Sequence, residues 1–130
     1  MEGFHSGEVG SVVDVPNSKP MLLKTPSPPY YAVIFSSLRT KVDDGYAAMT
    51  NLMVELASQQ PGFLGVETAR DGLGLTVSYW ETEDSIAAWK ANLKHAAAQR
   101  LGREKWYEAY TVRVCRVERD YAGGVSAKDE

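Results

Sequence analysis

Residue types that cross-link a chain or bind metals are scarce in this sequence. Its 130 residues include one cysteine, Cys115, and two histidines, His5 and His95. A lone cysteine cannot close a disulfide within the chain. The histidines fit none of the HxxxH, HExxH or CxxC spacings of common metal sites. The sequence therefore predicts a fold without covalent cross-links, no metal and no other cofactor, with Cys115 a small apolar side chain on a strand.

Long hydrophobic runs and a surplus of positive charge are also missing. No stretch approaches the roughly 20 apolar residues that a membrane-spanning helix needs. Asp14, Pro16 and Pro20 interrupt the short apolar pieces near the N-terminus, so the apolar region of a secretory signal is absent. The formal net charge is −3, whereas a general nucleic-acid binder normally carries a basic surplus. We expect a cytoplasmic protein that binds neither membrane nor nucleic acid.

Composition divides the chain into three parts. Residues 1–29 hold five of the six prolines and show little hydrophobic periodicity, which predicts a flexible N-terminal arm. Residues 30–120 carry the regular hydrophobic patterns, and roughly 100 residues suffice to build one core. Residues 121–130 form a small polar C-terminal tail. We therefore expect one domain flanked by two short extensions.

The first half of the domain predicts a strand followed by a helix. The segment YYAVIFSSLR, which starts at Tyr30, is apolar on both faces, as in a strand buried on two sides. Asp43 or Asp44 can cap a helix, and apolar residues then recur at spacings of three and four as far as Ser58. The Pro-Gly pair that follows ends this helix.

A hairpin comes next. Asp71 and Gly72 form a strong turn motif, because glycine accepts the positive φ that such turns require. Strands are expected over residues 63–69 and 75–80 on either side of this turn.

A long helix and a last strand complete the domain. Thr82 can cap the helix, and Gly102 breaks or ends it. The final strand is expected to run from Trp106 to Glu118. The helical period is kept by Ile86, Trp89, Leu93 and Ala97.

The order strand, helix, strand, strand, helix, strand predicts an α+β fold of the ferredoxin-like βαββαβ type. In this arrangement both helices cover one face of a four-stranded antiparallel sheet. The other face would leave apolar groups exposed in a monomer, and a second copy is the economical cover, so we expect a homodimer. The candidates for that face are Tyr31, Val33, Phe35, Thr76, Ser78, Trp80, Thr111 and Cys115, or the residues that alternate with them.

Four segments of the domain are distinctive: PPYYAVIFSSLRT, ELASQQPGFLGVETARDG, TVSYWETEDSIAAWKAN and HAAAQRLGREKWYEAYTVRVCRVER. Over about residues 30–120 the chain resembles the antibiotic biosynthesis monooxygenase (ABM) domain family of dimeric α/β-barrel proteins. That family includes oxygenases that convert polycyclic anthrones to quinones without metal or flavin, haem-degrading enzymes, and members with no assigned reaction. The resemblance therefore implies the fold and the dimer more strongly than a reaction.

The resemblance also implies a pocket between the sheet and the helices of one subunit. Trp89, on the core face of the long helix, either packs as bulk or forms a wall against which a planar aromatic ligand stacks. Asn92 borders the same face and is either an exposed residue or an amide that hydrogen-bonds a phenolate or an oxygen-bearing intermediate. Further aromatic residues around this helix either pack or line the cavity: Tyr79, Trp80, Trp106, Tyr107 and Tyr110.

His95 is harder to place. At about 100° per residue it lies about 120° around the helix from Trp89. We therefore expect it to face solvent or to lie at a helix bend, with a catalytic role as the alternative.

The basic residues allow two interpretations. Acids predominate over residues 42–88 and bases over residues 89–119, which indicates either helix-dipole complementarity or a rim that prefers an anionic ligand. Arg100 or Arg103 either stays on the surface or binds an anionic ring substituent.

Our first functional hypothesis is a cofactor-independent monooxygenase that acts on a small aromatic compound, such as an anthrone or a quinol. Such a reaction needs a dry apolar pocket, with Trp89 as its wall and Asn92 as a polarising group. Tyr79 or His95 would transfer the proton. Candidate ligand contacts are Trp80, Arg103, Trp106 and Tyr110.

A second hypothesis is a binding or stress-related module with the same pocket and no turnover. Haem binding is less favoured. Haem-degrading relatives carry an iron-binding histidine ten residues after the helix tryptophan, where this chain has Gln99, and an asparagine on the first strand, where it has Ser36 or Ser37. Triad hydrolysis would need a nucleophile elbow, which is absent.

Overall fold

A computed structural model describes residues 21–124, with only the backbone described at Leu93 and Lys94. The strands are β1 (Tyr30–Arg39), β2 (Phe63–Asp71), β3 (Leu73–Trp80) and β4 (Tyr107–Val117). The helices are α1 (Tyr46–Ser58), α2 (Glu83–Ala91) and α3 (Leu93–Leu101), and α3 continues into a π-helical turn, η1 (Gly102–Trp106).

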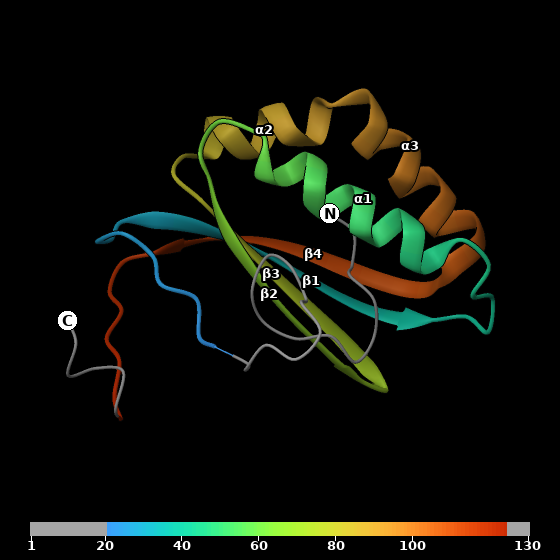
Figure 1. Cartoon of the computed structure of the whole chain (residues 1–130), viewed down its shortest axis with the longest axis horizontal. Coiled ribbons are helices and arrows are strands. Elements are labelled where there is room, and N and C mark those ends of the chain that lie inside the picture. The colour runs from blue at the N-terminus through green and yellow to red at the C-terminus, as the bar shows by residue number, and fades with distance from the viewer. Residues whose placement is uncertain (1–20, 125–130) are drawn as a thin grey trace.

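The strands form one antiparallel sheet in the order β2-β3-β1-β4, and the helices lie on one face of it (Figure 1). The helix α1 connects β1 to β2, and α2 with α3 connects β3 to β4. Neither pair of strands is adjacent in the sheet, which is the ferredoxin-like βαββαβ arrangement. The predicted α+β fold is confirmed. No helix of residues 21–124 is long and apolar enough to cross a membrane.

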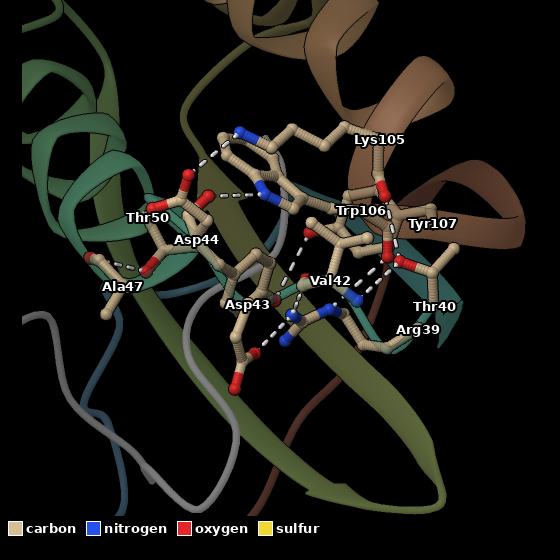
Figure 2. Close-up of polar contacts among 11 residues, drawn as sticks. Arg39, Thr40, Val42, Asp43, Asp44, Ala47, Thr50, Lys105, Trp106 and Tyr107 are labelled. Carbon is tan, nitrogen blue, oxygen red and sulfur yellow. Dashed lines mark hydrogen bonds and ion pairs between the residues drawn. The ribbon is translucent and has the colours of Figure 1, made fainter.

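The start of α1 differs from the prediction. Gly45 is the N-cap, with a φ of 79°, and no side chain caps the helix. The two aspartates bind elsewhere: the Asp43 carboxylate pairs with Arg39 at 2.7 Å, and the Asp44 carbonyl accepts a hydrogen bond from Trp106 (Figure 2). The expected aspartate cap is therefore wrong, because these groups connect the β1–α1 loop to its neighbours instead.

The hairpin and the second helix start as predicted. Gly72 has a φ of 80° in the turn between β2 and β3. Thr82 accepts a hydrogen bond from the Ser85 N–H at 3.0 Å through its hydroxyl oxygen, so it caps α2. Both motifs depend on residues close in sequence, which makes them visible without the tertiary structure.

The strand register shows which side chains face the helices. Val33 pairs with Ser78 on β3 and with Val114 on β4, so these three share the helix-facing side. The proposed assignment of the opposite face is corrected, because β1 is apolar on both sides and its alternation does not show the phase. Tyr31, Val33, Phe35, Thr76, Ser78 and Trp80 face the helices, whereas Thr111 and Cys115 face away with Ile34, Leu75, Val77 and Tyr79.

Part of the N-terminal extension lies against the face opposite the helices. Leu23 packs over Gly65 on β2, and its N–H donates to the Glu67 carboxylate at 3.1 Å. The Tyr30 hydroxyl hydrogen-bonds Thr25 and Asp120, which joins this segment to the residues that follow β4. Residues 21–29 are thus attached to the sheet, while the rest of the predicted arm, residues 1–20, lies outside the described part of the chain.

Two aromatic clusters fill the space between sheet and helices. We call the first the Trp89 end, made of Val33, Met53, Ala57, Trp80, Trp89 and Ala98. We call the second the Trp106 end, made of Phe35, Tyr46, Trp106 and Tyr107.

Candidate functional site

A pocket of about 100 Å³ opens at the Trp89 end, between the helix-facing side of β1, β3 and β4 and the helices α2 and α3. Its position is the one that the family resemblance implies. Val112 and Val114 on the edge strand β4 keep 47% and 52% of their surface exposed, so the pocket opens beside that strand. The lining residues are Val33, Phe35, Ser78, Ile86, Trp89, Lys90, His95, Gln99, Val112 and Val114.

The long helix that the sequence predicted is interrupted at Asn92, and this break creates the site. In a continuous helix, residues six positions apart would lie about 120° apart and about 9 Å along the axis. Asn92 instead has an extended ψ of 132°, and the rings of Trp89 and His95 stack with centroids 4.5 Å apart at an interplanar angle of 16°. Of the two expectations for His95, exposure to solvent is wrong and a bend in the helix is present: the break turns His95 inward to 3% exposure.

Asn92 holds the two helices in this relationship. Its side-chain oxygen accepts a hydrogen bond from the His95 N–H at 3.3 Å, and its carbonyl accepts one from Ala96 at 2.9 Å. These contacts resemble an N-cap, since they satisfy donors at the start of α3. Asn92 is not among the residues that line the pocket. Its geometry therefore favours positioning of His95 over the polarising role that we expected.

His95 is a neutral imidazole of defined tautomer. Its Nδ1 lies 3.0 Å from the Trp89 carbonyl oxygen, which can only accept, so Nδ1 carries the proton and Nε2 the lone pair. Burial lowers the pKa of His95 to about 3, and the positive charge of Lys90 also lowers it. At neutral pH the ring is uncharged and is a weak base.

Trp89 carries a buried donor that no described residue satisfies. The indole is 3% exposed, and its Nε1 has no hydrogen-bond partner within residues 21–124. In contrast, Trp80 donates to the Ser78 hydroxyl at 2.9 Å and Trp106 to the Asp44 carbonyl at 3.1 Å. A buried unpaired donor costs about 1–3 kcal/mol. Because Trp89 also lines the pocket, this unpaired donor is a candidate contact for a ligand oxygen.

Tyr79 lies outside the site. It pairs with Ala32 and Gly65 on the face of the sheet away from the helices, and its hydroxyl donates to Glu67 at 3.0 Å. Burial and this carboxylate raise its pKa well above the ordinary value. The suggestion that Tyr79 transfers a proton in the pocket is therefore corrected. Successive side chains of a strand face opposite sides of the sheet, and Tyr79 lies on the side away from the pocket.

The remaining candidates also lie apart from the pocket lining. Trp80 is fully buried in the core, stacked beside Trp89 with ring centroids 6.2 Å apart. Trp106 belongs to the other cluster, and Tyr110 packs on Phe35 with centroids 5.5 Å apart. The exposed residues Arg100 and Arg103 are absent from the lining.

Several lining residues were not anticipated. Val33, Phe35 and Ser78 were assigned to the other face of the sheet, and Lys90 was assigned no place in the pocket. On a regular helix Lys90 lies about 100° from Trp89, so the helical pattern assigns it to a different face. Two lining valines, Val112 and Val114, follow from the alternation of the last strand. The described residues contain no group of three or more His, Cys, Asp or Glu side chains that could hold a metal ion.

Comparison with known proteins decides the family. The sequence profile of the family described as antibiotic biosynthesis monooxygenase (ABM) matches residues 29–101. The chain belongs to the ABM family. It is 55% identical over 100 residues to the uncharacterised protein YqjZ of Bacillus subtilis, an alignment that covers 75% of this chain and 88% of YqjZ. ABM-domain proteins are commonly dimeric.

Solved structures support the same fold for this ABM protein. Rv0793 of Mycobacterium tuberculosis superposes with a TM-score of 0.62 at 12% identity, covering 72% of this chain and 99% of that one. A protein of Nitrosomonas europaea superposes with a TM-score of 0.59 at 13% identity, covering 73% and 95%. At these identities the likeness concerns the fold alone.

Proposed function

We propose that this ABM-family protein is a cofactor-independent monooxygenase that acts on a small aromatic compound in the Trp89 pocket. The observation that carries the proposal is the unpartnered, buried Trp89 N–H beside the stacked, neutral His95. A largely apolar lining surrounds them, and a ligand that fills this lining displaces water, which favours carbanion chemistry.

The substrate supplies all the electrons in this reaction. A ring methylene flanked by activating groups loses a proton to the solvent, and the resulting carbanion forms a C–O bond with molecular oxygen. The O–O bond then breaks: one oxygen atom stays as a carbonyl, and the other leaves as water with the two hydrogens of the methylene. The protein contributes orientation, dryness and a donor for the negative oxygen.

Each residue has a distinct part in the proposed site. Trp89 is the wall on which the ring stacks, and its N–H donates to the substrate oxygen. His95 offers the Nε2 lone pair to a substrate hydrogen. Asn92 is a positioning residue that holds His95 through the start of α3.

Oxygen uptake with a panel of monocyclic quinols and anthrones tests the proposal. We expect uptake that chelators leave unchanged and that Trp89→Ala abolishes. Asn92→Ala lowers the rate by about tenfold, and Asn92→Asp, which can still cap a helix, restores it. If Asn92 instead polarised a substrate anion, Asp would be worse than Ala. Failure of the whole panel to turn over would contradict the proposed activity.

Non-catalytic ligand binding is the second candidate, and the pocket size favours it. A cavity of about 150 Å³ is known to hold benzene, whereas this pocket measures about 100 Å³. A fused three-ring compound would have to extend through the mouth. A ligand that raises the melting temperature without consuming oxygen would support this alternative. A haem is far larger than the pocket, and a Soret band on titration would be required to support haem binding.

We also propose that the protein forms a homodimer through the sheet face opposite the helices. Leu73 and Leu75 on that face keep 52% and 43% of their surface exposed, and Leu75 adjoins the apolar Val77 and Ile34. Sedimentation tests this: we expect a dimer at micromolar concentration, and dissociation by Leu75→Glu. Leu101→Glu, on the helical layer, is the matched control and leaves the dimer intact. A stable wild-type monomer would contradict the proposal.

A further inference from the structure

The charged residues that line the pocket indicate which class of substrate it binds. This inference rests on the proposal that the pocket is the substrate site. Lys90 and His95 are the titratable residues of its lining, and no carboxylate is among the lining residues. No ion pair joins Lys90 to a carboxylate of residues 21–124. His95 is neutral, so Lys90, an exposed residue of α2, is the one charged residue of the lining.

The nearest strand adds no negative charge to the lining. Arg116 follows Val114 by two positions on β4 and therefore shares its helix-facing side. Its guanidinium lies 3.9 Å from Glu118, which compensates it. Lys90 thus remains the uncompensated charge among the described residues at the pocket.

The hydrogen-bonding groups also favour an anionic substrate. The buried Trp89 N–H can only donate, so it requires an acceptor, and a negative oxygen is a stronger acceptor than a neutral one. The neutral His95 is too weak a base to take the proton of an ordinary phenol. A substrate that has already lost its proton to solvent needs no such base.

We propose that the pocket takes its substrate as a preformed oxyanion, a single-ring phenolate or enolate. The anionic oxygen accepts the Trp89 Nε1 hydrogen bond, and the Lys90 ammonium supplies the opposite charge. Lys90 is then a specificity-determining residue that selects acidic ring compounds over neutral rings of the same shape.

Anaerobic binding of 4-nitrophenol provides a direct test, because its ionised form is coloured and its pKa lies near neutrality. We expect the pKa of the bound compound to fall by about one unit or more, which corresponds to about tenfold tighter binding of the anion. The neutral analogue 4-nitroanisole, which has no acidic hydroxyl, should bind about tenfold more weakly at pH 8.

Two variants test which side chains cause the preference for the anion. Lys90→Met removes the charge and keeps the length of the side chain, and Trp89→Phe removes the N–H and keeps an aromatic wall. Both should return the pKa of bound 4-nitrophenol towards its solution value while 4-nitroanisole binding changes little. Arg103→Met, which removes an exposed charge outside the lining, is the matched control and should leave that pKa lowered.

Three results would overturn the inference: a bound 4-nitrophenol whose pKa is unchanged or raised, equal affinity for 4-nitroanisole, or no binding of either compound. Because the titration is done without oxygen, its outcome is separate from that of the uptake assay. A positive titration without turnover would retain the oxyanion site and reject the monooxygenase.

Discussion

Both ends of the helical layer hold a buried tryptophan beside the sheet, but the Trp106 and Trp89 indoles differ in their hydrogen bonding. At the Trp106 end the indole donates to the Asp44 carbonyl, and the Tyr107 and Tyr46 hydroxyls bond each other at 3.2 Å. At the Trp89 end the indole N–H has no partner among the described residues and a pocket lies beside it. The comparison teaches that an unpaired indole donor beside a pocket, and not the presence of aromatic residues, distinguishes the candidate site from packed core.

The Trp106 end is closed by contacts between distant parts of the chain. The Thr40 N–H and hydroxyl donate to the Trp106 and Lys105 carbonyls, each at 2.8 Å (Figure 2). The Arg39 guanidinium stacks over the Tyr46 ring at 3.4 Å. These contacts join the β1–α1 loop to the π-helical turn and tie the Trp106 end together.

Alanine substitution of each tryptophan is expected to have the largest effect and to separate the ends. Trp106→Ala should destabilise the fold by about 4 kcal/mol, because it creates a cavity in closed core and leaves the Asp44 carbonyl unpaired. Trp89→Ala should cost at least about 1 kcal/mol less, because solvent can enter from the existing pocket. Urea unfolding measures both, and equal losses would contradict the distinction.

The next effect in size is a pH dependence confined to the Trp89 end. The pKa of His95 is about 3 in the folded state and about 6.5 when unfolded, so the unfolded chain binds more protons between these values. Stability is full above pH 6.5 and is lost as the pH falls towards 3. From pH 7 to pH 5 the wild type should lose about 2 kcal/mol more than His95→Gln. Identical pH profiles of the two proteins would show that His95 is not buried as described.

The smallest expected effect isolates the indole hydrogen bonds. Trp106→Phe loses a satisfied bond and should cost about 1 kcal/mol more than Trp89→Phe, which removes a donor that is already unpaired. Thermal unfolding of the two variants at one pH measures the difference. A larger loss for Trp89→Phe would mean that its N–H has a partner in solution.

The fold was predictable because its determinants are local. Hydrophobic periodicity, the Asp71-Gly72 turn and the Thr82 cap each depend on residues a few positions apart. The face of the sheet on which each side chain lies was not predictable, because β1 is apolar on both sides and does not indicate which side meets the helices. That ambiguity placed Tyr79 in the pocket, although its side chain lies on the opposite face.

The arrangement of the site depends on a helix break, which hydrophobic periodicity does not reveal. Trp89 was identified from its core position, but the place of His95 follows from the break at Asn92. Asparagine is a favoured N-cap residue, so a new helix start at this position was available as an interpretation. Lys90 becomes a pocket residue through the arrangement of α2, α3 and β4, which the helical pattern of α2 alone does not contain.

The packing of Leu23 on β2 requires position 65 to lack a side chain. Gly65 has a φ of 152°, and a Cβ built there would lie 2.5 Å from a Leu23 methyl group. A methyl at position 65 would therefore displace the Leu23 side chain from β2 while leaving the helix-facing side of the sheet untouched. Position 65 thus bears on how residues 21–29 lie against the sheet, on the face opposite the candidate site.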